Sequence, residues 1–157
     1  MPGFGARMRR ALPRPTRRRV VAGSVLLVLL LAALTWAAWP ESTPYRTEDR
    51  MLTVPSGPAG DEPVTLDTRF YLPEGASAGQ KVPAVLLAHG FGGTKASVRD
   101  DAEDLATAGY AVLTWTARGF GRSGGQIHLN DPDHEVRDAQ RLLDWLAARP
   151  QVRTDAV

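Results

Sequence analysis

Two apolar runs, each leading into a glycine-rich turn, constrain the fold of this chain more than any other feature. The first run covers residues 82–88 and ends directly in His89-Gly90-Phe91-Gly92-Gly93. The second covers residues 110–115 and is followed by Arg118-Gly119-Phe120-Gly121-Arg122-Ser123. Strands that are apolar along almost their whole length are typical of parallel sheets covered on both faces. With the helical pattern between them, the two runs predict a strand–turn–helix–strand–turn unit.

The segments before this unit predict an antiparallel hairpin. Residues 50–54 form a short strand-like stretch, and residues 64–72 alternate apolar and polar side chains as a half-buried strand does. The turn-rich residues 55–60 lie between them. The predicted fold class is therefore α/β, with a hairpin at the sheet edge followed by a parallel strand–helix–strand–helix arrangement.

Two helices complete the predicted domain. The first follows the turn at residue 93, with Thr94 or Ser97 available as its cap, and Gly109 ends it. The second begins near Pro132, because proline fits the first turn of a helix. Pro150 prevents its continuation.

The first 39 residues differ from the rest in charge and hydropathy. The chain carries seven arginines and no acidic residue in its first 19 positions, and no charge in the next 20. A helix of about 20 residues spans roughly 30 Å, the thickness of a hydrocarbon core. Arginines before this stretch and acidic residues after it place the N-terminus in the cytoplasm. We predict a basic cytoplasmic tail (1–19), a transmembrane or signal-anchor helix (20–39), a linker (40–49) and an extracytoplasmic domain (50–157).

The same segment fixes the expected location and partners. Its small-residue cleavage sites are poor, which favours an uncleaved anchor in the cell membrane, and cleavage would instead yield a secreted protein. Beyond residue 40, 12 basic and 17 acidic residues remain, so no nucleic-acid partner is expected. The chain has no cysteine, which excludes disulfides and thiolate metal sites.

The first glycine turn has the features of an oxyanion-binding loop. It follows a buried strand, where open α/β sheets place their ligands. Acyl transfer develops negative charge on a carbonyl oxygen, and glycines let backbone N–H groups approach that oxygen closely. We predict the backbone N–H of Phe91 as a donor, with His89, Gly90, Gly92 and Gly93 as the supporting loop. The alternative is a simple tight turn with His89 held structurally.

The second glycine turn contains two misleading motifs. Residues 121–125 spell G-x-S-x-G, but the nucleophile elbow needs a strand entering and a helix leaving at once, and here the next helix is predicted only near Pro132. Residues 119–124 spell G-x-G-x-x-G, and the late helix also argues against a dinucleotide site. We therefore expect Ser123 not to be a nucleophile and Arg118, Gly119 and Gly121 to support the loop.

No metal or cofactor site is predicted. His128 and His134 lie among three acidic residues, Asp131, Asp133 and Glu135. Acidic residues at a helix start and solvated histidines account for this cluster better than metal ligation does. Asp138 is expected on the helix surface, paired with Arg141 or Arg118.

The glycine turns and the helix EVRDAQRLLDWL together resemble the Xaa-Pro dipeptidyl-peptidase and cocaine-esterase group of α/β-hydrolases, over residues 52–157. The string RGFGRS is more specific to that group than HGFGG. Thr116 stands where many hydrolases have an aspartate two residues before the arginine. The resemblance implies a serine hydrolase that cleaves peptide or ester bonds with a Ser–Asp–His triad. It also places the nucleophile on the strand after Pro150, so we expect this chain to carry the oxyanion loop but no triad residue, and to be an inactive N-terminal fragment.

Two other functions stay open at the level of the sequence. One is a non-enzymatic exported α/β module whose glycine turns are only architectural. The other is a nucleotide-binding α/β protein that uses the loop 119–124.

Overall fold

The computed structural model describes residues 17–37 and 43–155, and the chain divides into the units 1–41 and 42–157. In the first unit, residues Arg17–Ala37 form the helix α1, with exposed apolar side chains from Val21 to Trp36. Most of the predicted tail 1–19 and the end of the predicted span 20–39 lie outside the described residues. Within those ranges, no helix has the length and hydropathy needed to cross a membrane. The predicted membrane span is therefore not confirmed.

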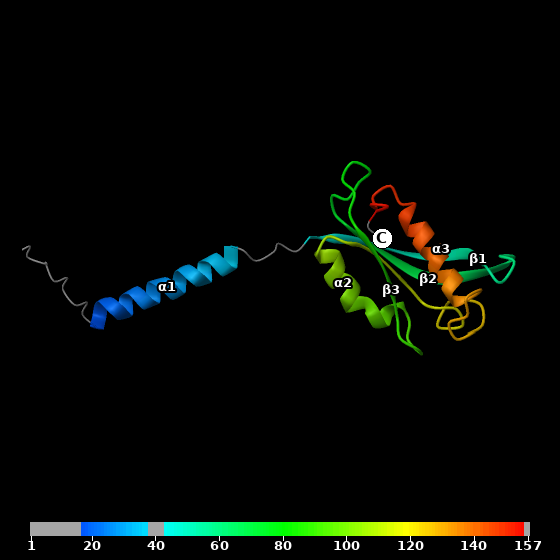
Figure 1. Ribbon diagram of the computed structural model, residues 1–157, viewed down its shortest axis with the longest axis horizontal. Helices are drawn as coiled ribbons and strands as arrows, with labels where there is room; N and C mark the ends of the chain where they lie inside the picture. Colours follow the sequence, from blue (N-terminus) through cyan, green and yellow to red (C-terminus); the bar gives the residue numbers. More distant parts are fainter. Residues whose placement is uncertain (1–16, 38–42, 156–157) are drawn as a thin grey trace, which may run out of the picture. The chain divides into compact units, whose positions relative to one another are not determined.

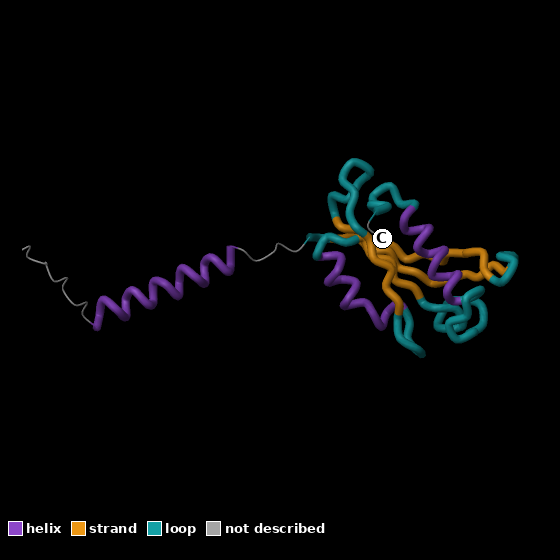
Figure 2. The backbone as a smooth tube through the Cα atoms, viewed as in Figure 1, coloured by secondary structure: helices purple, strands orange, loops and turns teal. Residues whose placement is uncertain are grey.

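The second unit is built on a four-stranded mixed sheet with the order β1-β2-β4-β3 (Figures 1 and 2). Its strands are β1 (Tyr45–Ser56), β2 (Glu62–Pro73), β3 (Ala84–Ala88) and β4 (Ala111–Trp115). β1 pairs antiparallel with β2, β2 antiparallel with β4, and β3 parallel with β4. The predicted α/β class, the hairpin and the parallel pair are confirmed. β1 is longer than predicted and begins at Tyr45, inside the range assigned to a linker.

Helices cover both faces of this sheet because side chains of a strand alternate between its faces. Phe70 and Leu113 pack with Leu142 and Leu146 of α3 (Glu135–Ala147). The neighbours Tyr71 and Val112 pack on the other face against Ala102 and Ala106 of α2 (Arg99–Thr107). The two clusters give the sheet the doubly covered core that its apolar strands require.

The ends of α2 are fixed by local sequence signals. A short 3₁₀ helix, η1 (Lys95–Val98), precedes α2, and its capping box joins Thr94 and Ser97. At the other end, Gly109 adopts a φ of +95°, and the N–H of Tyr110 donates to the carbonyl of Leu105 over 3.1 Å. This is a Schellman ending, as the glycine predicted.

α3 starts later than predicted. The helix begins at Glu135 and not near Pro132. The Asp131 carboxylate accepts a hydrogen bond from the N–H of Asp133 at 2.9 Å and contacts the His134 ring at 2.8 Å. A side chain that satisfies the backbone in this way favours a turn over a helix, so residues 132–134 form a turn before α3.

Candidate active site

The turn after β3 is held in one conformation by two hydrogen bonds to the same carbonyl. The N–H of Gly93 donates to the Gly90 oxygen over 3.0 Å, and Gly92 has a φ of +80°. A positive φ at the third residue is the mark of a type II turn, and it requires glycine. The Nδ1 of His89 lies 2.7 Å from the same Gly90 oxygen.

The His89 ring is occupied at both nitrogens. A carbonyl can only accept, so Nδ1 carries the proton and donates to Gly90. Nε2 accepts a hydrogen bond from the N–H of Ala117 over 2.9 Å. With neither nitrogen free, His89 links the first glycine turn to the segment after β4.

The Phe91 amide lies at the tip of this turn. Among the described residues, its N–H donates a hydrogen bond to no group. The Phe91 side chain is 82% exposed, and its ring packs edge-on against Phe120 with centroids 5.4 Å apart. Binding of an oxyanion needs a backbone donor that is held in a fixed turn and is not used by another group.

The second glycine turn is anchored by a buried ion pair. The Arg118 guanidinium donates two hydrogen bonds of 2.7 Å to the Asp138 carboxylate, and it also donates to the Ser56 hydroxyl. Ser56 donates to Asp138 over 3.0 Å. The hydrogen bond to Asp138 raises the pKa of Arg118 above its usual value. Of the two partners considered for Asp138, the structure pairs it with Arg118, and Asp138 is buried and not on the surface because the ion pair lies between α3 and the end of β1.

Ser123 has the contacts of a structural serine. Its hydroxyl donates to the Thr116 carbonyl over 2.5 Å and accepts from the N–H of Asp67 over 2.9 Å. Both hydrogen bonds tie the loop to the end of β4 and to β2. A nucleophilic serine needs a base that accepts the proton of its hydroxyl, whereas the Ser123 hydroxyl donates to a backbone carbonyl.

The glycines of this loop meet backbone and packing needs. Gly119 has a φ of +75°, and a Cβ there would lie 2.6 Å from the side chain of Ile127. Gly121 has a φ of +49° and lies against Thr94 and Thr116. No helix follows Gly124 until Glu135, so the helix N-terminus that a dinucleotide fingerprint requires is absent from this part of the described chain.

A pocket of about 300 Å³ opens beside the Phe91 turn. Its lining includes His89, Phe91 and Phe120 from the two glycine turns, and Ile127, Leu129 and Glu135 from the residues that follow them. The Glu135 carboxylate accepts from the N–H of His128 at 2.6 Å and of Asp131 at 3.0 Å. Burial alone would raise the pKa of Glu135, but these backbone N–H groups outweigh it and lower the pKa.

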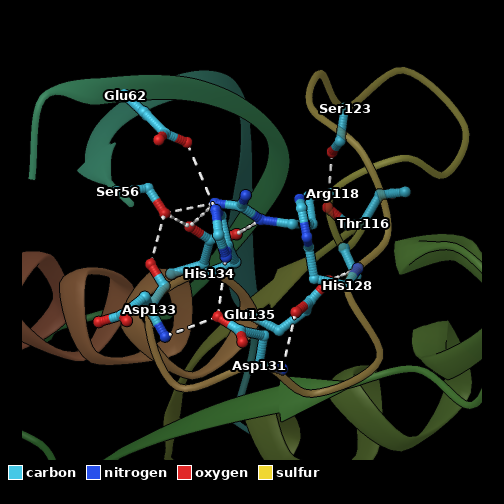
Figure 3. Close-up of polar contacts among 12 residues, drawn as sticks. Ser56, Glu62, Thr116, Arg118, Ser123, His128, Asp131, Asp133, His134 and Glu135 are labelled. Carbon is cyan, nitrogen blue, oxygen red and sulfur yellow. Dashed lines mark hydrogen bonds and ion pairs between the residues drawn. The ribbon is translucent and has the colours of Figure 1, made fainter. Parts of the chain in front are cut away.

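The two histidines near the pocket stack on each other. The rings of His128 and His134 lie 3.8 Å apart and nearly parallel, and His134 Nε2 is 3.4 Å from a Glu62 oxygen (Figure 3). The hydrogen bond to Asp131 raises the pKa of His134. Within residues 17–37 and 43–155, no three acidic or histidine side chains converge as metal ligands.

The sequence did not point to several residues that hold the site together. Lys95 donates from Nζ to Asp67 at 2.6 Å and to Asp49 at 2.8 Å, and its backbone N–H donates to the Thr116 hydroxyl at 3.1 Å. These contacts join β1, β2 and η1 to the segment that follows β4. Lys95 belongs to no recognisable sequence motif, and no pattern surrounds Ser56 in its strand. The sequence therefore did not predict a role for either residue.

The sequence of this domain matches the model of a known protein family. The sequence model of X-Pro dipeptidyl-peptidase (S15 family) matches residues 60–157, more than half of the chain. A curated epoxide hydrolase from Caballeronia sordidicola is 39% identical over 66 residues, which are 41% of this chain and 20% of that protein.

Two solved structures share the fold. A hypothetical protein from Pseudomonas aeruginosa is 27% identical with a TM-score of 0.54, over 73% of this chain and 34% of that one. DcsB, solved in complex with its substrate analogue, is 21% identical with a TM-score of 0.52, over 69% of this chain and 35% of that one. The chain spans about a fifth of the curated relative and about a third of these structures.

Proposed function

Because the chain belongs to the X-Pro dipeptidyl-peptidase (S15) family, we propose that it supplies the oxyanion side of a serine hydrolase that cleaves peptide or ester bonds. The observation that carries this proposal is the Phe91 N–H. It stands at the tip of a type II turn and donates to no other described group. In an acyl transfer it would donate to the carbonyl oxygen as that oxygen becomes negative.

The remaining catalytic groups are proposed to lie outside these 157 residues. The hydroxyl of Ser123 is committed to Thr116 and Asp67. Both ring nitrogens of His89 are committed to backbone groups. The S15 resemblance implies a serine, an aspartate and a histidine, and the chain spans only about a third of the structures it matches. In this scheme the serine attacks the carbonyl carbon, the histidine takes its proton, and the leaving group departs from the tetrahedral intermediate.

A substitution at residue 91 tests the oxyanion role directly. Proline has no N–H, yet it is favoured at the second position of a type II turn, where Phe91 stands. Phe91→Pro therefore removes the donor and keeps the turn, whereas Phe91→Ala removes the ring and keeps the donor. We expect Phe91→Pro to lower kcat about 10²–10³-fold relative to Phe91→Ala in the full-length protein. Equal kcat values for the two variants would refute the assignment.

A fluorophosphonate probe tests the reaction class. The full-length protein is expected to be labelled at a serine beyond residue 157, and Ser123→Ala is expected to leave this labelling unchanged. Loss of labelling in Ser123→Ala would transfer the nucleophile to this loop. Absence of any labelling would remove the serine-hydrolase proposal.

We also propose that the N-terminal segment exports the hydrolase domain. Support comes from the seven arginines before an uncharged stretch of 20 residues. The domain would then act outside the cytoplasm, held at the cell membrane or released by cleavage. A fusion of residues 1–49 to alkaline phosphatase, which is active only after export, tests this. The proposal predicts an active fusion and an inactive one when residues 20–39 are deleted.

A further inference from the structure

We propose that the pocket beside Phe91 binds an aliphatic group next to the scissile bond, with Leu129 as a specificity-determining residue. This inference rests on the serine-hydrolase function proposed above. It adds a substrate class to that function: esters or amides with a short unbranched aliphatic chain on one side of the bond.

Three of the residues that line the pocket are apolar and exposed. Phe91 is 82% exposed, Leu129 74% and Ile127 41%, and all three line the same cavity. Exposed apolar side chains gathered around a cavity mark a binding surface more often than isolated ones do. Because Phe91 itself lines the pocket, a bound apolar group would lie next to the proposed oxyanion donor.

Leu129 is held in a conformation that folding alone does not favour. Its φ is +59°, and that of the following Asn130 is +65°. A left-handed conformation is unfavourable for leucine, although asparagine tolerates it. A leucine that is both strained and exposed contributes little to the core, and such strain is commonly kept where a function needs it.

Glu135 keeps Leu129 in this place. Its two carboxylate oxygens accept from the backbone N–H groups of His128 and Asp131, on either side of Leu129 and Asn130. The first residue of α3 therefore determines the shape of the loop. The two hydrogen bonds hold the Glu135 carboxylate against the backbone of the loop, and the exposed side chains of Phe91, Ile127 and Leu129 offer a bound group its apolar contacts.

The volume limits the size of the bound group. A cavity of about 300 Å³ lies at the lower end of the range for small-molecule pockets. The expected occupant is thus a chain of a few methylene groups. Each methylene moved out of water favours binding by about fourfold until the pocket is full.

The test compares two series of substrates on the full-length protein. p-Nitrophenyl esters from acetate to octanoate vary the acyl side, and acetates of alcohols from ethanol to octanol vary the leaving group. Leu129→Asn removes the apolar contact and also suits the left-handed backbone, so it should fold at least as well. Met51→Gln, at another exposed apolar residue on β1, is the matched control.

We expect kcat/KM to rise with chain length in one of the two series. The preference for the six-carbon over the two-carbon substrate should fall about tenfold in Leu129→Asn and stay unchanged in Met51→Gln. The series that responds identifies the side of the bond. The inference is overturned if neither series shows a chain-length preference, or if the preference survives in Leu129→Asn. It is also overturned if another segment of the full-length protein covers the pocket and blocks access.

Fluorophosphonate labelling separates this inference from the function on which it rests. A labelled protein with no change of preference refutes only the aliphatic pocket. A protein that is not labelled refutes the serine-hydrolase function and the pocket with it.

Discussion

Removal of the Asp138 carboxylate is expected to destabilise the domain severely. Asp138 accepts two hydrogen bonds of 2.7 Å from Arg118, and the side chains are only 3% and 4% exposed. Asp138→Ala leaves the guanidinium buried, with the Ser56 hydroxyl as its one remaining side-chain hydrogen-bond partner among the described residues. Breaking a buried pair in this way costs about 3–5 kcal/mol. A domain of this size is stable by about 5–15 kcal/mol, so a large part of its stability would be lost.

The same helix provides the control. Arg141 and Asp144 form an ion pair of 3.3 Å, with side chains 43% and 70% exposed. Exposed pairs contribute about 0–1 kcal/mol because water and salt screen them. Asp144→Ala should therefore change the free energy of unfolding little. Urea unfolding of the full chain, followed by circular dichroism, measures both variants.

The double variant Arg118→Met/Asp138→Leu completes the experiment. It removes both charges together, so no unpaired ion remains buried, and it should recover most of the stability lost in Asp138→Ala. The reasoning fails if Asp138→Ala and Asp144→Ala cost the same. It also fails if Asp138→Ala does not fold and the double variant is no better.

Three further predictions concern the turns and the loop. The raised pKa of His134 means that its interactions with Asp131 stabilise the fold fully below about pH 6.5 and are lost as the pH rises through the folded-state pKa. The difference in unfolding free energy between the wild type and His134→Gln should thus be larger at pH 5.5 than at pH 8.5, and a difference that does not change with pH would contradict this. Gly92→Ala should lower the free energy of unfolding, measured with urea, by about 1–2 kcal/mol, because alanine is unfavourable at a φ of +80°. Gly90→Ala should lower it less, because φ is not positive there and a Cβ would meet nothing within 4 Å. Ser123→Ala should destabilise by about 1–3 kcal/mol, since it leaves the N–H of Asp67 without its partner, and no loss of stability would show that this hydrogen bond is dispensable.

The fold was predictable where the sequence carries short-range signals. The apolar runs that become β3 and β4 and the glycine at the end of α2 each fix local structure through one physical requirement. Boundaries that depend on tertiary pairing were not predictable. β1 extends back to Tyr45 because it pairs with β2 as far as Pro73, and nothing in residues 45–49 alone indicates a strand.

The candidate site was predictable only in its backbone. The glycine pattern located both turns, because the positive φ at Gly92 and Gly119 favours glycine at these positions. The groups that hold the turns come from distant positions: Ser56 is 62 residues from Arg118, and Lys95 is 28 residues from Asp67. No spacing in the sequence predicts contacts between residues that are so far apart along the chain. The surface position predicted for Asp138 was wrong for the same reason. Helical periodicity does not show that a buried arginine after β4 lies beside this position of α3.

These distant contacts make the two glycine turns a single unit. Ala117, next to Arg118, donates to His89, and the Phe120 ring packs against both the His89 and Phe91 rings at 5.7 and 5.4 Å. A displacement of the second turn must therefore move the Phe91 amide, since packed side chains shift together. Misplacing a catalytic donor by about 1 Å is enough to lower a rate about 10²-fold. It follows that the RGFGRS segment, which touches no reacting atom in the proposed mechanism, is constrained together with the turn that carries the proposed oxyanion donor.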